Sequence, residues 1–492
     1  MKKRIKIFVA LLLALSLVLV ACGGNGGTTE PADDTTETAP ADDTADTDDT
    51  ADAADDTGDD SDDEDAPAPP VDGVTEVSFF TWWGGGEMTM GEALWAEFED
   101  RYPHIHVLQN YIPFSDYLAL INTMMAAGNP PDVFHMVENA VFEWAHQGVA
   151  EDLAPHLAAR GIDPFDKWIE IAVFEDEGHI WALAPGLGTT VLYYNIGMLE
   201  EAGITPPPRD AANPWTWDQY VEAAILLTRD VDGNMPGDPG FNYNNVVQWG
   251  TIMPNAWLWV MSLLYSADSS IADDAGLNPM ITQPAGVSAL QNMADLAHVH
   301  QVAPTLALTG HGALGSTHVM LMNDQLAMFV GGSWAHSNFY NEDYTVGIAQ
   351  IPTMTGAASN MAWGAAFMMA EGAGEAAVEV ILYMHDFNNW VESARAHEIA
   401  LPLVVQTRST IEDPALNAAW AEVFYPDLGE LLGDILANGS RVGENVTLRN
   451  FDEIINQVIT PMLDRIWLGE LSAAEGMAEI EGTLEGLMEG VW

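Results

Sequence analysis

Residues 74–86, which read VTEVSFFTWWGGG, contain the pattern that determines how the fold begins. Apolar residues alternate along residues 74–82, and this alternation predicts a β-strand. Three glycines then interrupt the pattern, and apolar residues at helical spacing follow from Met90 to Tyr102. Pro103 ends the helix that this spacing predicts, because proline cannot continue a helix.

The same order of elements continues downstream. Residues 105–109 alternate as a second strand, and a helix through Leu118, Ile121 and Met125 follows. A Gly-Asn-Pro-Pro run at residues 128–131 ends this helix, and residues 132–136 form a third predicted strand. Strands that alternate with helices through short turns predict an α/β fold with a parallel sheet wrapped by helices.

Candidate ligand contacts follow two of these strands. Trp82 and Trp83 come after the first strand, and Glu138 and Asn139 come after the third. Ligands of open parallel sheets bind beyond the carboxyl ends of the strands. An indole offers a flat apolar surface, while carboxylate and amide groups bond hydroxyls, and this combination suits a sugar. A core role for the two indoles stays open, and one of them is expected in the core because adjacent strand residues point to opposite faces.

Tryptophans recur along the rest of the chain. Trp257, Trp334 and Trp363 lie in or near short loop-like segments and are further candidates for stacking on a ligand. The two tryptophans beside Thr216 differ, because Thr216 is a good N-cap for a helix from residue 217 to about residue 229. We expect that pair to pack at the start of the helix.

Composition excludes several classes of protein. The chain has 492 residues and is 48% apolar, which excludes disorder throughout. Only 14 Lys and Arg face 74 Asp and Glu, a formal charge of −60, so the chain is expected to bind neither nucleic acid nor an anionic membrane through a basic patch. The single cysteine excludes intrachain disulfides and multi-cysteine metal sites, and no cofactor is expected.

The amino-terminal residues have the pattern of an export signal. Four basic residues within positions 1–6 precede an apolar run at residues 7–20, which is short for a membrane span. Residues 19–23 read LVACG and resemble the bacterial lipoprotein signal, in which the cysteine becomes the new terminus and carries the lipid. This resemblance predicts a signal peptide at residues 1–21 and a lipid on Cys22. An ordinary signal peptide with an incidental cysteine is the alternative.

An acidic, low-complexity segment follows. Residues 23–72 contain 19 acids and no base, with little to bury, so residues 22–72 are expected to form a disordered tether. The remaining body, residues 73–492, keeps 55 acids and 10 bases, and its only lysine is Lys167. Such even acidity leads to the hypothesis of a high-salt habitat.

Six passages of the body occur in an order that resembles a known family. They lie at residues 82–86, 126–134, 147–153, 193–204, 215–218 and 326–334. The body is similar to the family 1 extracellular solute-binding proteins, the maltodextrin-binding-like receptors of ABC sugar importers. The resemblance implies a periplasmic-binding-protein-like fold of two lobes joined by crossover strands. The implied boundaries are about 73–188 plus 361–402 for lobe 1 and about 189–360 plus 403–492 for lobe 2.

The resemblance also assigns expected roles to individual residues. Asn139 stands where the family has a polar ligand contact, and Trp334 stands at the stacking tryptophan of the second lobe. Gly188 and Thr189 occupy the crossover where some relatives supply an acid, and this chain has none there. Trp82, Trp83, Glu138, Trp257 and Trp363 are proposed as ligand contacts from their placement in loops.

These observations predict a non-enzymatic, monomeric receptor anchored by Cys22 to the outer face of the cell membrane, or in the periplasm if an outer membrane exists. It would bind a sugar or oligosaccharide between the lobes and deliver it to the permease of an ABC importer. A cell-surface polysaccharide hydrolase is one alternative, because 55 acids provide carboxylate pairs by chance. A receptor for a non-sugar solute is the other.

No metal site is predicted, with one question left open. Residues 230–234 read DVDGN and begin like a calcium loop, but Phe241 stands where the bidentate glutamate belongs. Both a calcium-stabilised surface loop and a simple turn fit this sequence.

Overall fold

The computed structural model describes residues 73–492 apart from 211, 255, 307–316, 340–345, 357–358, 400–406, 424–430, 433–434 and 436–439. The chain divides into two units between Ala68 and Pro69, and the description below concerns the second. The predicted signal peptide, Cys22 and the tether lie outside the described residues.

A six-stranded mixed sheet organises the first lobe. Its spatial order is β2-β1-β3-β12-β5-β4. The strands are β1 (Thr75–Thr81), β2 (Ile105–Tyr111), β3 (Val133–Met136), β4 (Val173–Asp176), β5 (His179–Leu183) and β12 (Ala366–Met369). The three strands predicted from the sequence are parallel, with β1 between β2 and β3. The sheet is not parallel throughout, because β12 runs antiparallel to β3 and β5, and β4 runs antiparallel to β5.

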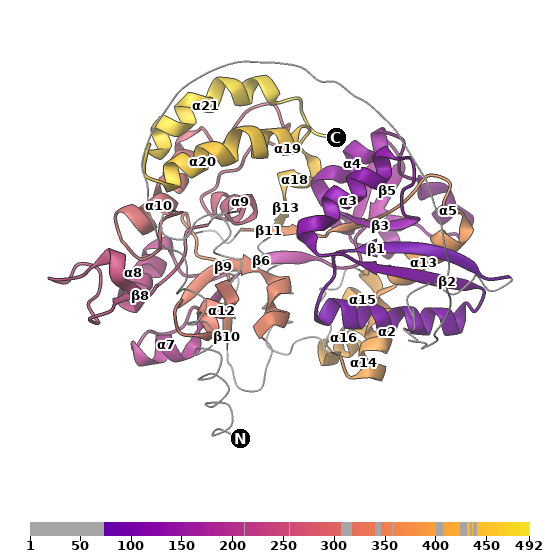
Figure 1. The fold of residues 1–492 in the computed structure, drawn as a ribbon, viewed down its shortest axis with the longest axis horizontal. Coiled ribbons are helices and arrows are strands. Elements are labelled where there is room, and N and C mark those ends of the chain that lie inside the picture. The colour runs from indigo at the N-terminus through magenta and orange to yellow at the C-terminus, as the bar shows by residue number, and fades with distance from the viewer. Residues whose placement is uncertain are drawn as a thin grey trace, which may run out of the picture. The chain divides into compact units, whose positions relative to one another are not determined.

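Helices from two distant parts of the chain cover this sheet. Helix α13 packs on β1, β3 and β12, and α14 packs against α2. Figure 1 shows the orange α13 and α14 beside the indigo α2, although almost 300 residues separate them in sequence. The helices of the first lobe are α2 (Gly86–Arg101), α3 (Phe114–Ala126), α4 (Glu138–His146), α5 (Ala154–Ala159), α6 (Pro164–Lys167), η1 (Glu170–Ala172), α13 (Glu375–Met384), α14 (Phe387–His397), α15 (Arg408–Glu412) and α16 (Pro414–Val423).

A second sheet forms around the long strand β6. Its spatial order is β10-β6-β11-β13, and β9 also pairs with β6. Strand β6 runs antiparallel to β9, β10 and β11, and β11 runs parallel to β13. The strands are β6 (Gly188–Asn195), β9 (Met328–Gly332), β10 (Val346–Ala349), β11 (Asn360–Trp363) and β13 (Ser440–Val442), with a separate pair β7 (Arg229–Asp230) and β8 (Val246–Gln248).

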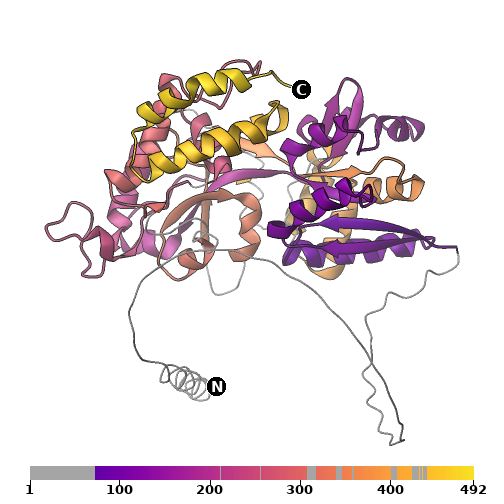
Figure 2. The ribbon, with the colours of Figure 1, turned by 45° about the horizontal axis from the view of Figure 1, so that its top comes forward.

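The second lobe consists of this sheet and the helices around it. Helix α9 packs on β11, and α10 packs against α9 and α21. Figures 1 and 2 show the yellow α20 and α21 beside α10, so the last helices of the chain return to this lobe. The helices are α7 (Ile196–Glu201), α8 (Trp217–Leu227), η2 (Tyr243–Asn245), α9 (Trp257–Tyr265), α10 (Pro284–His298), α12 (Thr317–Met322), η4 (Ser333–Phe339), α18 (Glu444–Thr447), α19 (Phe451–Glu453), η5 (Ile454–Ile459), α20 (Thr460–Trp467) and α21 (Ala473–Leu487).

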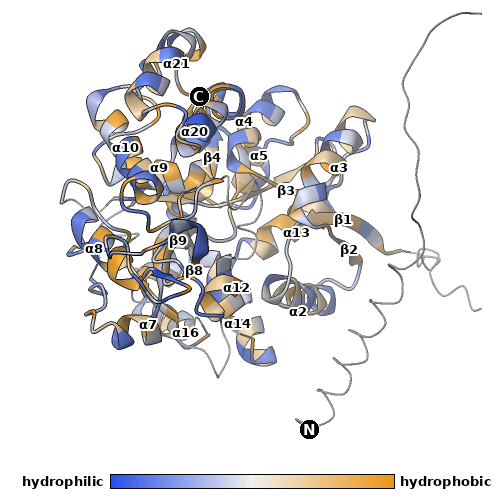
Figure 3. Ribbon diagram, turned by 60° about the vertical axis from the view of Figure 1, so that its left-hand side comes forward, coloured by the Kyte–Doolittle hydropathy of each residue, from blue (hydrophilic) through white to orange (hydrophobic). Residues whose placement is uncertain are grey.

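Two hydrophobic cores form the interior, and β6 takes part in both. The first core extends from the first lobe to one face of the second sheet, where it includes Phe329 and Ile348, and the second core lies on the other face. Val191 and Tyr193 belong to the first core, while Leu192 and Tyr194 belong to the second. Successive residues of a strand point to opposite faces, so a strand buried on both faces can supply two cores. Orange and blue residues alternate along the helices in Figure 3, as expected for helices with one buried face.

A buried polar network ties β6 to β11 where the chain passes between the sheets. The Thr189 hydroxyl donates to the carbonyl oxygen of Met361 at 2.9 Å. The Asn360 amide donates to the carbonyl oxygen of Thr190 and accepts a hydrogen bond from the Gln350 amide. All of these side chains are buried, so each bond satisfies a group that water does not reach.

We predict that Asn360→Ala lowers the free energy of unfolding by about 1–3 kcal/mol, because it leaves the Gln350 amide and the Thr190 carbonyl without partners. Urea denaturation followed by circular dichroism measures this change. Asn244→Ala is the matched control, because its side chain is exposed. Equal stability of the two variants would contradict a structural role for this network.

Candidate ligand-binding site

Three indole rings gather at the edge of the second sheet. Trp334 lies in η4 directly after β9, and 38% of its surface is exposed. Trp259 of α9 stacks on it with ring centroids 5.9 Å apart and planes 28° apart. Trp363 of β11 meets it edge-on at 5.0 Å. The half-buried Trp259 and the buried Trp363 hold the exposed Trp334 ring in place, which suits a platform for a ligand.

Two glycines allow Trp334 to lie against the backbone. A Cβ atom at Gly332 would lie 2.2 Å from a ring atom of Trp334, and one at Gly188 would lie 3.1 Å from another. Any side chain at Gly332 would therefore displace the indole. Some relatives are expected to have an acid at the crossover. In this chain the Trp334 ring lies against Gly188 at that position.

Helix α9 contributes a second aromatic contact through Trp257. Its ring meets Phe451 of α19 edge-on at 5.0 Å. Trp257 and Trp259 diverge because residues two apart on a helix point about 200° apart. The sequence analysis selected Trp257 from this segment and missed Trp259, the residue that stacks on Trp334. Helical periodicity would have shown that the two rings face different neighbours, but not which neighbour each has.

A polar contact joins the two lobes next to these rings. The Asn139 amide of α4 donates to the Asp452 carboxylate of α19 at 2.5 Å, and Asp452 follows Phe451 in the chain. Burial raises the pKa of Asp452, although the bond from Asn139 opposes this rise. The contacts therefore run from Trp257 of α9 through α19 to Asn139 at the start of α4.

Glu138, the neighbour of Asn139, is a buried acid, and one oxygen of its carboxyl group lacks a partner among the described residues. Only 5% of its surface is exposed, and its Oε1 atom has no hydrogen-bond partner among the described residues. Burial raises the pKa of Glu138 to about 7, because the charged form loses its hydration. In the first turn of α2, which follows β1, burial likewise raises the pKa of Glu87 to about 7. The carboxyl edge of the first sheet thus holds two sheltered acids.

The other buried acids of the described chain have partners. Glu444 accepts a hydrogen bond from the Tyr265 hydroxyl and pairs with Arg441 at 3.4 Å. Asp230 accepts bonds from Asn234 and from the backbone N–H groups of Asp232 and Asn242. Glu138 therefore differs from both of the other buried carboxylates.

The contacts of Asp230 also bear on the calcium question. Burial by itself would raise the pKa of Asp230, but hydrogen bonds from Asn234 and from nearby backbone groups hold it below its usual value. Its oxygens act as acceptors that close the turn at residues 230–234. Within the described residues, no group of three or more His, Cys, Asp or Glu side chains could hold a metal ion. The loop geometry therefore agrees with the simple turn.

The remaining predicted residues pack against or bond other residues of the protein. Trp83 is buried, with its ring near Phe79, Phe367 and Trp390, so it is the core member of the first tryptophan pair. Trp82 is half-buried and stacks on His135 at 3.7 Å. The Thr189 hydroxyl is committed to β11, so this residue positions the crossover strand.

A comparison of the sequence with models of protein families identifies the family of this chain. The model of the bacterial extracellular solute-binding proteins matches residues 93–385. The chain belongs to this family.

The relatives and structural neighbours of this solute-binding protein are binding proteins rather than enzymes. An arabinooligosaccharide-binding protein of Halalkalibacterium halodurans is 25% identical over 238 residues, 47% of this chain and 48% of that protein. One of Bacillus subtilis is 24% identical over 237 residues, 47% of this chain and 49% of that protein. The matched part of the chain thus spans about half the length of these relatives. Family membership implies a location outside the cytoplasm, and no helix among the described residues is long and apolar enough to cross a membrane.

Solved structures confirm the two-lobed α/β fold of the solute-binding protein. A substrate-binding protein of Listeria monocytogenes in complex with cycloalternan aligns with a TM-score of 0.69 at 19% identity, over 84% of this chain and 99% of that one. The GacH receptor of Streptomyces glaucescens, solved unliganded and with acarbose, aligns with a TM-score of 0.66 at 18% identity, over 85% and 99%.

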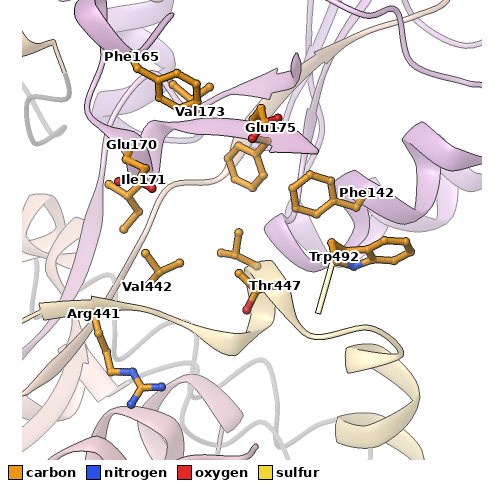
Figure 4. Close-up of a pocket in the computed structure, with 12 residues that line it drawn as sticks. Phe142, Phe165, Glu170, Ile171, Val173, Glu175, Arg441, Val442, Thr447 and Trp492 are labelled. Atoms are coloured by element: carbon orange, nitrogen blue, oxygen red, sulfur yellow. The ribbon is translucent and has the colours of Figure 1, made fainter. Parts of the chain in front are cut away.

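The solute-binding protein also has a cavity of about 490 Å³ that none of the predicted residues line. Figure 4 shows Phe142 and Trp492 on one side and Val442 and Thr447 on another, with the Arg441 side chain directed away. Trp492 already stacks on His146 at 4.9 Å. None of the predicted residues lines this cavity, so we place the candidate site at the exposed ring of Trp334 and at the Asn139–Asp452 contact.

We predict that Glu138→Gln stabilises the protein near neutral pH. The folded-state pKa of Glu138 lies above the usual carboxyl value, so its ionisation opposes folding as pH rises from about 4.5 to about 7. Removing the charge should raise the free energy of unfolding by about 1–3 kcal/mol above pH 7 and leave it nearly unchanged below pH 4.5. Urea denaturation across this pH range measures the difference.

Asp230→Asn is the matched control, and it should lower stability above pH 4, because hydrogen bonds to the charged form of Asp230 are lost. A destabilising effect of Glu138→Gln at neutral pH would show that the carboxylate has a stabilising partner.

Proposed function

We propose that this chain is a lipid-anchored, extracytoplasmic receptor that binds a sugar or oligosaccharide between its lobes and delivers it to the permease of an ABC importer. The exposed Trp334 ring, held by Trp259 and Trp363, is the observation that carries this proposal. The C–H faces of a sugar ring pack on such an indole, while Glu138, Asn139 and Asp452 offer hydrogen bonds to hydroxyls.

The relatives support the same class of ligand. Two of them are named as arabinooligosaccharide-binding proteins, and structural neighbours were solved with cycloalternan, acarbose and maltose. The proposed lobes are about 73–188 plus 361–402 and about 189–360 plus 403–492, except that α15 and α16, at residues 408–423, pack against α6 and α14 of the first lobe. Cys22 is the proposed site of the lipid, and the acidic segment at residues 22–72 is the proposed tether.

Binding would proceed without bond-making. A ligand that contacts Trp334 on one lobe and Glu138 or Asn139 on the other makes its full set of contacts only when the lobes meet. This differential contact shifts the population towards the closed state, which the importer would then recognise.

We predict that Trp334→Ala weakens binding of the best neutral oligosaccharide by about tenfold or more, as expected for loss of an aromatic anchor. Calorimetric titration of the purified full chain with arabino- and malto-oligosaccharides measures the affinity. The loss should exceed that of removing any one carboxylate of the site. Trp181→Ala, a half-buried tryptophan of β5, is the control. Unchanged affinity in Trp334→Ala would remove this residue from the site.

A further inference from the structure

The Oε1 atom of Glu138 lacks a hydrogen-bond donor among the described residues, and a ligand could supply one. This atom is buried, and burial of a charged oxygen without a hydrogen-bond donor is unfavourable. Among the described residues, no lysine or arginine forms an ion pair with Glu138, Glu87 or Asp452. Arg441, the cation on the neighbouring strand β13, is committed to Glu444 and lies over the Tyr265 ring at 4.2 Å. The described residues therefore supply no cation that pairs with Glu138.

Two other acids, Asp452 and Glu87, lie on elements that adjoin Glu138 or its parent strand. Asp452 comes from the second lobe and is one hydrogen bond away through Asn139, the next residue in the chain. Glu87 lies in the first turn of α2, which follows β1, and β1 is the parallel neighbour of β3, which leads to Glu138. Burial raises the pKa of each of these three carboxyl groups, so each is more easily buried in its neutral form than as a carboxylate.

From these observations we infer that the ligand is an amino sugar or an oligosaccharide with an unacetylated amine, whose ammonium group pairs with Glu138. This inference rests on the proposed sugar-binding function. A hydroxyl would supply only a hydrogen-bond donor, whereas an ammonium supplies both donors and the missing positive charge. Hydrogen bonds between charged groups are the stronger kind, and the acidic surface raises the local concentration of cationic ligands.

The position of Glu138 fits a ligand that reaches across both lobes. Contacts lead from Trp334 through Trp259 to α9, and from Trp257 of α9 through Phe451 and Asp452 to Asn139. The sugar ring would stack on Trp334 in the second lobe, and the amine would reach Glu138 in the first. Parting of the lobes at the Asn139–Asp452 contact would open the path to the carboxylate.

Three sets of oligosaccharides with the same β-1,4 backbone test the inference, because they differ only at carbon 2. They are glucosamine oligomers, their N-acetylated counterparts and glucose oligomers. Calorimetry on the purified full chain in high salt, which screens non-specific attraction, measures each affinity. We expect the amine series to bind about tenfold more tightly than the glucose series, the size of a charge-assisted bond. Glu138→Gln should reduce this ratio to within about threefold.

Glu143→Gln is the matched control, because Glu143 is an exposed acid on the same helix α4, and it should keep the wild-type ratio. The inference is overturned if the glucose series binds as tightly as the amine series, or if Glu138→Gln keeps the preference. Neutral sugars that bind without any amine preference would leave the proposed function standing and remove only this inference. Arabino- and malto-oligosaccharides complete the panel, and the absence of binding by every saccharide would overturn both.

Discussion

The fold depends on burial of both faces of strand β6. Its alternate residues enter two different cores, and its first residues pair with β11. The chain leaves the first sheet after β5, passes along β6, and returns through β11 to β12. Each lobe therefore contains residues from distant parts of the sequence. Stability of either core then requires that β6 and β11 stay paired, and the buried amide of Asn360 contributes to that pairing.

The aromatic site is a consequence of the same pairing. Trp363 ends β11, Gly188 begins β6, and Gly332 ends β9, so all three positions meet at one end of the second sheet. Trp334 lies over the two glycines, and α9 supplies Trp259 from outside the sheet. A platform built in this way is rigid, because each ring is held by backbone or by another ring. Rigidity of this kind lowers the entropy lost when a ligand stacks on the platform.

Glu138 shows how binding and stability oppose each other. Asp230 and Glu444 are buried carboxylates whose partners offset the loss of hydration, while the Oε1 atom of Glu138 has no hydrogen-bond partner among the described residues. Its ionisation therefore opposes folding near neutral pH. A group of this kind is expected at a binding site, where the ligand supplies what the protein lacks.

The sequence by itself determined the local elements of this solute-binding protein. Alternation and helical spacing identified the first three strands and the helices between them, and Thr216 caps α8 through a reciprocal bond with Gln219 as its residue type indicated. These features follow from interactions between residues close in the chain. The six short passages and the position of Trp334 also indicated the family. They could do so because the order of elements along the chain is visible in the sequence, whereas the contacts between the elements are not.

Only the tertiary structure decided which residues meet across the chain. Trp259 rather than Trp257 stacks on Trp334, Trp83 lies in the core, and Asn139 bonds Asp452, which is 313 residues away. No local pattern encodes these pairs, because each depends on how two separately folded segments are placed by β6 and β11. The unpartnered Oε1 atom of Glu138 could not be predicted from the sequence either. Its burial and its lack of a donor among the described residues depend on how distant segments pack together.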